Sequence, residues 1–222
     1  MRCYLVRHAQ TLWNGENRLQ GHSDLELNAV GRQQAERVGS FLKTCRSVSE
    51  PIRALYTSHL KRSLQTAQAI AHHVGLAPTV EPALSEIGLG TWEGLTPEEI
   101  DARFDGAYQR WRRCPSEVTI PGGEPIDRFR RRVHEAFHRM TSRADEGGAT
   151  VIVSHGGVIA TWLAEWLGVD YDQVLRRVML DNGSVSAVEC RAHPPHILWV
   201  NAIQHLTPDV LTPSWDLVAP SA

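Results

Sequence analysis

The chain has 222 residues and a formal net charge of −2, with 23 Lys and Arg residues against 25 Asp and Glu residues. Hydrophobic residues make up 42% of it, which suffices for one sizeable core, and the near-neutral balance suggests neither a nucleic-acid nor a membrane surface. No apolar run approaches the roughly 20 residues that cross a bilayer, so we expect no transmembrane helix and no signal peptide. The four cysteines form no C-x-x-C pair, which favours reduced thiols in a cytoplasmic protein.

The first stretch that carries chemistry follows residues 3–6, an apolar run that predicts a short buried strand. Arg7, His8, Thr11 and Asn14 come directly after it. Side chains at the end of a strand in an α/β sheet are fixed by the sheet, whereas the following loop stays open to ligands. Arginine can bind a phosphate through its planar fork of donors, and histidine can act as a nucleophile or base. For an isolated Arg-His pair, a simple strand end would be the better interpretation.

A second predicted strand ends in the same way. Residues 150–154 form an apolar, β-branched run that is followed by His155, Gly156 and then a predicted helix over 158–167. Glycines let backbone N–H groups approach an anion, and the positive end of the helix dipole favours negative charge at the same place. Two strands therefore end in histidine beside groups that suit a phosphate.

A third strand, predicted over 54–57, brings an arginine to the same edge of the sheet. We expect Ser58 to cap the following helix, which places Arg62 in its first turn. The polar loop over 14–24 would fold over a bound anion. Its candidate phosphate donors are Asn14, Gln20 and Gly21.

Taken together, these motifs resemble the histidine phosphatase superfamily, also called phosphoglycerate mutase-like. The matching segments are Arg7-His8-Ala9-Gln10-Thr11 with Trp13-Asn14, Leu19-Gln20-Gly21, Ser58 to Ala67, Glu86, and Ser154-His155-Gly156-Gly157. They occur in the family's order, and the set is far more specific than any one motif. Ala9 stands where most members carry glycine, a change that we expect to reduce slack in the loop without affecting the chemistry.

The resemblance implies a three-layer α/β/α sandwich with a mostly parallel central sheet, as the alternation of strands and helices also suggests. We expect a single domain over 1–206 with an insertion around 87–130, and an irregular tail over 207–222. Further helices are predicted after Asn28 as N-cap and along the apolar stripe that begins at Ile126. Two further strands, over 183–189 and 197–202, would form the outer part of the sheet.

The resemblance also assigns roles. It implies that His8 is the nucleophile, that Glu86 is the proton donor, and that Arg7, Arg62 and His155 bind the phosphoryl oxygens. Thr11, Asn14, Gln20, Gly21 and Gly156 would complete the phosphate site. Burial beside a phosphate would raise the pKa of Glu86 so that it could hold a proton. Glu93 is the alternative acid, although a structural role is the simpler interpretation of this residue. No metal and no cofactor is expected, because the arginines and an imidazolium of His155 would supply the positive charge.

The segment after Glu86 separates two branches of the family. Ile87-Gly88-Leu89-Gly90-Thr91-Trp92 resembles the phosphatase branch more than the arginine- and tyrosine-bearing segment of the mutases. We therefore predict a metal-independent phosphomonoesterase that acts on small phosphorylated metabolites. A cofactor-dependent phosphoglycerate mutase and a non-enzymatic phosphate-binding or scaffold protein stay open as alternatives. The oligomeric state is not fixed by the sequence, which is compatible with a homodimer.

Two further patterns need an interpretation. Phe104, Tyr108 and Trp111 have the spacing of an apolar stripe on one short helix, and this insertion is where we expect substrate side groups to be recognised. His134 and His138 lie in an H-E-x-x-H pattern that is typical of zinc peptidases. On a helical wheel both fall well away from the buried stripe, so we predict that they face water and bind no metal.

Overall fold

The computed structural model describes residues 1–45, 51–142, 148–191 and 194–211. Its centre is a sheet in the order β3-β2-β4-β1-β5-β6. The strands are β1 (Arg2–Arg7), β2 (Ile52–Thr57), β3 (Thr79–Val80), β4 (Ala149–Ser154), β5 (Val185–Glu189) and β6 (His196–Ala202). The first four are parallel to one another, whereas β5 runs antiparallel to β1 and β6 antiparallel to β5. The predicted α/β fold with a mostly parallel sheet is confirmed. Of the strands of this sheet, the sequence analysis missed the two-residue β3.

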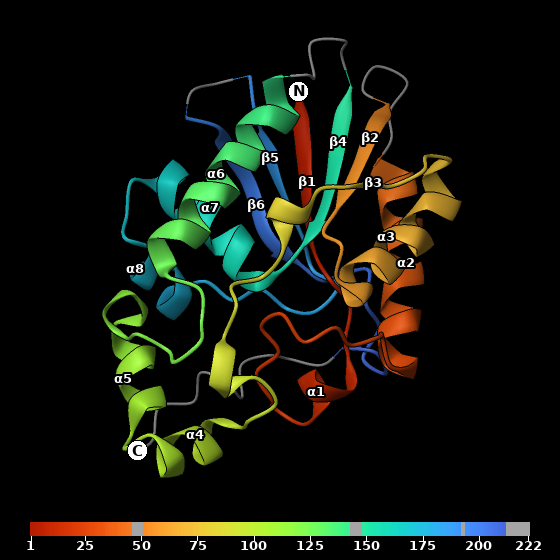
Figure 1. The fold of residues 1–222 in the computed structure, drawn as a ribbon. Coiled ribbons are helices and arrows are strands. Elements are labelled where there is room, and N and C mark those ends of the chain that lie inside the picture. The colour runs from red at the N-terminus through yellow and green to blue at the C-terminus, as the bar shows by residue number, and fades with distance from the viewer. Residues whose placement is uncertain (46–50, 143–147, 192–193, 212–222) are drawn as a thin grey trace.

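Helices cover both faces of this sheet (Figure 1). One face carries α2 (Ala29–Cys45) and α3 (Lys61–Val74), and the other carries α6 (Ile126–Ser142), α7 (Gly156–Leu167) and α8 (Tyr171–Arg177). Shorter elements, α1 (Leu12–Gly15), α4 (Pro97–Arg103) and α5 (Ala107–Arg113), lie beyond the carboxyl ends of the parallel strands. Three 3-10 turns are η1 (Pro82–Leu84), η2 (Gly90–Trp92) and η3 (Pro115–Glu117). Within the described ranges, no helix is both long and apolar enough to cross a membrane.

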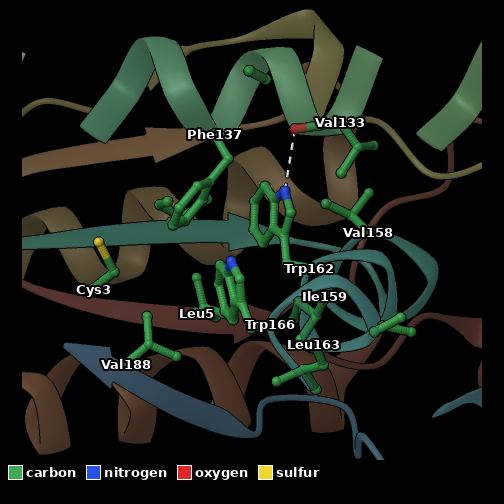
Figure 2. Close-up of a cluster of buried hydrophobic side chains, with 14 of the residues drawn as sticks. Cys3, Leu5, Val133, Phe137, Val158, Ile159, Trp162, Leu163, Trp166 and Val188 are labelled. Carbon is green, nitrogen blue, oxygen red and sulfur yellow. Dashed lines mark hydrogen bonds between the residues drawn. The ribbon is translucent and has the colours of Figure 1, made fainter. Parts of the chain in front are cut away.

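Alternation along β1 divides the core into two layers. Cys3 and Leu5 point to the layer under α6 and α7, whereas Tyr4 and Val6 point to the layer under α2 and α3. Figure 2 shows the first layer, where Leu5 from β1 meets the tryptophans of α7. The indole N–H of Trp162 donates to the Val133 carbonyl oxygen at 3.1 Å, which ties α7 to α6. Burial on both faces fixes the sheet, and therefore fixes the side chains at its strand ends.

The predicted helix starts were right at one place and wrong at another. Asn28 caps α2, because its side-chain oxygen accepts the Gly31 N–H at 2.7 Å. Ser58 does not cap α3: the helix begins at Lys61, and Leu60 precedes it without a side-chain cap. The Ser58 hydroxyl instead bonds to a histidine of the site described below.

The predicted single stripe of the insertion is divided between two elements. Phe104 ends α4, whereas Tyr108 and Trp111 lie on α5. The chain turns between them through Asp105 and Gly106, both at positive φ (50° and 68°), which no continuous helix allows. All three aromatic rings nevertheless pack around Trp92 in a small separate core.

Two other expectations are modified. The compact part of the chain extends past residue 206, because Val210 is buried and its carbonyl oxygen accepts the Gln34 side-chain amide; residues 212–222 of the predicted tail lie outside the described residues. His134 does not simply face water, since it is half-buried and pairs with Glu165 of α7. His138 is exposed, as predicted. Among the described residues, no three His, Cys, Asp or Glu side chains are placed to hold a metal ion.

Candidate active site

The two strand-end histidines meet at the carboxyl end of the sheet. Arg7 of β1 is in register with Ser154 of β4, so the next residues, His8 and His155, leave the sheet side by side. Their ring centroids are 5.1 Å apart, and both rings are buried. The His8 backbone N–H donates to the Ser154 carbonyl oxygen at 2.8 Å, which continues the pairing of the strands into the site. The sheet itself therefore sets the geometry of this histidine pair.

His8 is held in one tautomer. Its Nδ1 lies 2.7 Å from the carbonyl oxygen of Ala9, and a carbonyl can only accept, so Nδ1 carries the hydrogen. This leaves Nε2 with a lone pair. Burial, together with the charges of Arg62 and Arg7, lowers the pKa of His8 well below its usual value, and the ring is neutral at neutral pH. A neutral imidazole with one free lone pair is a suitable nucleophile.

His155 is also neutral. Burial and the nearby charges of Arg62 and Arg7 hold its pKa well below the usual value. This neutral state differs from the imidazolium that the sequence analysis expected at His155, and the positive charge of the site comes from the arginines. The Nε2 atom of His155 lies 2.8 Å from the Ser58 hydroxyl, whereas its Nδ1 is buried without a partner among the described residues. When Ser58 donates to Nε2, the Nδ1–H is left to donate into the site.

Two arginines supply the positive charge. Arg62 is 1% exposed, and its two Nη groups donate to the carbonyl oxygens of Ser23 and Gly21, each at 2.8 Å. Arg7 donates through Nη1 to the carbonyl oxygen of Leu180. Burial lowers the pKa of Arg62 to about 10 and also lowers that of Arg7, yet both remain protonated at neutral pH. The two guanidinium groups are thus fixed by backbone oxygens, and no carboxylate of the described residues forms a salt bridge with either one.

The arginines retain unused donors, as His155 does. The Nε atoms of Arg7 and Arg62 are buried without a hydrogen-bond partner within the described part of the chain. Buried N–H groups of this kind are rare because each costs about 1–3 kcal/mol when it is left unsatisfied. Together with the two positive charges, these unpaired donors indicate a site for an anion that accepts hydrogen bonds.

Glu86 lines the same cavity as His8 and the two arginines. One of its carboxylate oxygens accepts the Gly157 N–H at 3.1 Å, and the other accepts its neighbour's N–H, from Ile87, at 3.0 Å. A Cβ at position 157 would stand only 2.4 Å from Glu86 Oε1, so glycine is required for this approach. Tyr171 is buried beside the same point, and burial and the Glu86 charge raise the pKa of its phenol well above the usual value.

An arginine that sequence reasoning missed fixes the segment that carries Glu86. Arg132 of α6 donates to the carbonyl oxygens of Ala83, Ser85 and Glu86 at 2.7–2.8 Å. The same guanidinium makes a two-pronged pair with Glu124, at 2.8 and 2.7 Å. Arg132 lies in a run of three arginines, and nothing in the local sequence separates it from its two neighbours.

The other predicted residues take different places. Asn14, Gln20, Gly21 and Gly156 line one cavity together with Arg7, His8, Arg62 and Glu86. His155 is fully buried against the His8 ring and is not among the lining residues. Thr11 does not line the cavity: its hydroxyl accepts the Asn14 N–H at 3.3 Å and donates to Asn14 Oδ1 at 3.0 Å, so it caps α1 and holds Asn14. Asn182, which was not predicted, donates to the carbonyl oxygen of His8 at 3.0 Å.

Glu93, the alternative acid, has a structural role. One carboxylate oxygen accepts the backbone N–H groups of His22 and Leu89, at 2.8 and 3.1 Å, and the other accepts the Ser23 hydroxyl at 2.7 Å. Glu93 therefore ties the loop over 20–23 to the start of the insertion. In the described chain it does not line the cavity.

One cavity of about 280 Å³ is lined by a neutral imidazole, two guanidinium groups and a carboxylate. These are the groups that a phosphoryl-transfer site requires. The family model of the histidine phosphatase superfamily (branch 1) matches residues 3–203. The chain therefore belongs to this superfamily, as its motifs suggested, and it is a phosphoryl-transfer enzyme by class.

Similar proteins carry both phosphatase and mutase names. The chain is 40% identical to Phosphoglycerate mutase-like protein 4 of Arabidopsis thaliana over 70% of its own length and 66% of that protein. It is 33% identical to a Yersinia pestis protein named "Probable phosphoglycerate mutase GpmB", over 87% of each chain. Among solved structures, a mycobacterial glucosyl-3-phosphoglycerate phosphatase in complex with VO3 matches with a TM-score of 0.80 and 28% identity, over 91% of this chain and 99% of that one.

Proposed function

We propose that the protein is a metal-independent phosphomonoesterase that hydrolyses small phosphorylated metabolites through a phosphohistidine intermediate on His8. The observation that carries this proposal is the state of His8: a neutral ring whose Nδ1–H is held by the Ala9 carbonyl, with Nε2 unprotonated in a cavity shared with two arginines. A histidine with only a structural role would not need a free lone pair beside two cations.

In the first step, His8 Nε2 attacks phosphorus, so that an N–P bond forms as the P–O ester bond breaks. Arg7, Arg62, the Nδ1–H of His155 and the side-chain amide of Asn14 bind the phosphoryl oxygens. Oδ1 of Asn14 already accepts from Thr11 and Asn182, which leaves its Nδ2 hydrogens for the ligand. Glu86 gives its proton to the departing ester oxygen, and the alcohol leaves.

In the second step, a water molecule attacks the phosphorus of phosphohistidine. Glu86, now ionised, accepts the proton of that water, and the electrons of the N–P bond return to His8 as inorganic phosphate forms. The guanidinium groups act in both steps because the charge on the phosphoryl oxygens persists throughout. The positive charge that a metal ion would otherwise bring is supplied by the arginines, which supports independence from metal.

The mutase names of the two relatives favour a second candidate, phosphoglycerate mutase activity. A mutase returns the phosphoryl group from histidine to the substrate, whereas a phosphatase passes it to water. Conversion of 3-phosphoglycerate to 2-phosphoglycerate faster than release of inorganic phosphate would replace our proposal by this one.

The test is phosphate release from a generic aryl phosphate in excess chelator, by the wild type and by His8→Ala. We expect turnover by the wild type without added metal and none above background by the variant. Circular dichroism of both proteins shows whether the variant keeps its fold. A wild type that binds phosphate but hydrolyses no monoester would instead support a non-enzymatic phosphate-binding or scaffold protein.

A further inference from the structure

The catalytic cavity has two chemically different ends. The phosphate end carries the arginines and histidines described above. The cavity is also lined by a group of apolar and aromatic residues that we call the apolar wall: Ile87, Tyr108, Trp111, Leu175, Val178 and Met179. Ile87 directly follows the proton donor, and Met179 directly precedes Leu180, whose carbonyl oxygen holds Arg7. The wall therefore begins where the leaving group of a bound ester must project.

The wall comes from three separate segments, two of which, α5 and the segment that contains α8, are fixed to each other. Tyr108 and Trp111 stack on α5 with ring centroids 5.7 Å apart. The turn that follows α5 is joined to α8 by Asp172, which accepts the Ser116 hydroxyl at 2.8 Å, and by a hydrogen bond from Arg176 to the Arg113 carbonyl oxygen. These contacts are made within the protein itself, so the two segments hold each other in place.

Three arginines, Arg18, Arg112 and Arg176, also line the cavity, and part of the donor capacity of each is engaged within the protein. Arg18 donates through Nη1 to the Gly94 carbonyl oxygen at 2.7 Å and to the Glu99 carboxylate at 2.9 Å. Arg112 hydrogen-bonds the Tyr108 hydroxyl, and Arg176 is bound to α5 as described. In contrast, the Nε atoms of Arg7 and Arg62 have no partner among the described residues. A second anionic group on the substrate would meet donors that are in part already engaged, whereas the first one meets the buried Nε donors of Arg7 and Arg62.

We infer that the preferred substrates are phosphate monoesters of apolar alcohols, with an alkyl or aryl body that lies against the apolar wall. This inference rests on the proposed phosphatase function and names the substrate class of the same site. An apolar body gains free energy in proportion to the area that it buries, whereas a polar or charged body would lose hydration without new partners on this wall. Phosphorylated metabolites with a small, strongly polar body are accordingly the poorer substrates.

The test uses primary alkyl phosphates from ethyl to hexyl, whose leaving groups have nearly equal reactivity, so that differences in kcat/KM report on binding of the chain. We expect kcat/KM to rise about threefold to fourfold for each methylene that reaches the wall, and by at least about tenfold from ethyl to hexyl phosphate. Phosphoserine and 3-phosphoglycerate, compared in parallel, should fall below hexyl phosphate. A flat series, or a preference for the polar esters, overturns the inference.

Variants assign the effect to the wall. Met179→Gln keeps the length of the side chain but makes it polar, and Leu175→Ala shortens a second wall residue. Both should reduce the ratio of hexyl to ethyl phosphate activity by about threefold or more. Leu198→Ala is the matched control, because Leu198 is an exposed apolar residue of β6 that does not line the cavity, and it should leave this ratio unchanged.

A binding series separates this inference from the proposed function. Alkyl phosphonates from ethyl to hexyl cannot be hydrolysed, and their Kd can be followed by the fluorescence of Trp13 and Trp111, which line the cavity. Tighter binding with chain length in a protein that hydrolyses no ester would overturn the phosphatase proposal and retain the apolar site. Hydrolysis without any dependence of Kd or kcat/KM on chain length would retain the phosphatase and overturn the apolar site.

Discussion

The phosphate end of the cavity and the insertion that closes it are built in different ways. At the phosphate end, Arg7 is the last residue of β1, His8 follows β1 and His155 follows β4. Both strands are central and buried on both faces, which fixes the positions of these side chains. The insertion instead has a small core of its own around Trp92, apart from the two layers of the main core. In our proposal, the chemistry lies on the rigid sheet, and substrate recognition lies on short elements whose shape is set by local contacts.

The largest effect should come from the phosphate end. His8→Asn removes the nucleophile but keeps a similar polar volume, and we expect kcat to fall by at least about 10³-fold, because no second group can form the intermediate. Steady-state kinetics with an aryl phosphate measures this loss. The same variant should still bind phosphate through Arg7 and Arg62. If most of the wild-type kcat persisted, His8 could not be the nucleophile.

A smaller effect should come from the residue that joins the two regions. Arg132→Gln releases the carbonyl oxygens around Glu86, and we expect kcat to fall about 10- to 100-fold through misplacement of the proton donor. The loss should be larger for alkyl phosphates than for nitrophenyl phosphate, whose leaving group needs less protonation. Equal losses for both substrates would show that Arg132 does not act through Glu86.

The same change should also affect stability, because Glu124 loses its partner in a half-buried setting. We expect Arg132→Gln to lower the free energy of unfolding by about 1–3 kcal/mol. The double variant with Glu124→Gln should recover part of this loss, and urea unfolding of the single and double variants measures the coupling. An additive cycle would indicate that the pair contributes nothing.

Low pH should reduce the free energy of unfolding because two histidines at the phosphate end are buried in the neutral form. The folded-state pKa values of His8 and His155 lie well below about 6.5, the value for the unfolded chain. As pH falls below 6.5, the unfolded chain takes up protons that the folded chain does not, so stability is lost until pH reaches the folded pKa. Between pH 7.5 and 5, each histidine can contribute up to about 2 kcal/mol to this loss.

Variants again isolate this contribution. His8→Asn should lose less stability than the wild type over the same pH interval in urea unfolding. His196→Asn, which changes an exposed histidine of β6, serves as the control and should follow the wild type. Identical slopes for all three proteins would contradict the assignment of a neutral, buried His8.

The smallest effect on activity is expected from substitutions of the two α6 histidines of the H-E-x-x-H pattern. His134→Gln and His138→Gln, singly or together, should change kcat/KM by less than about twofold, because neither side chain lines the cavity. The pair of His134 with Glu165 is partly exposed and should contribute no more than about 1 kcal/mol to stability. Loss of activity on these substitutions, restored by zinc, would revive the metallopeptidase interpretation of the H-E-x-x-H pattern.

The same contrast explains how much the sequence could predict. The strands at the centre and the helices α2, α3, α6 and α7 have strong periodicity, because each buries one face or both, and their predicted positions agree with the structure. The site residues at the strand ends follow from that pattern. The insertion depends on the Asp105-Gly106 turn, a recognisable signal that divides the apolar stripe and that periodicity alone overlooked.

Other parts of the site could not be read from local sequence. α8 is preceded by Asp170, a favourable N-cap residue, and has apolar residues at helical spacing, so the sequence could have predicted this helix. The role of Arg132 depends on carbonyl groups nearly fifty residues away, and the bond of Ser58 to His155 spans 97 positions. Such contacts are set by tertiary packing. A serine before a helix therefore predicted a cap, when its hydroxyl is used to orient the second histidine.

The central claim is that His8 carries the phosphoryl group during turnover. The most direct measurement is rapid quenching of the enzyme during hydrolysis of a ³²P-labelled monoester in excess chelator, followed by peptide mapping of the labelled protein. Our account predicts an acid-labile, base-stable label on the peptide that contains His8, formed and lost at rates at least equal to kcat, and absent from His8→Asn. Turnover without such a label, or a label on another residue, would contradict it.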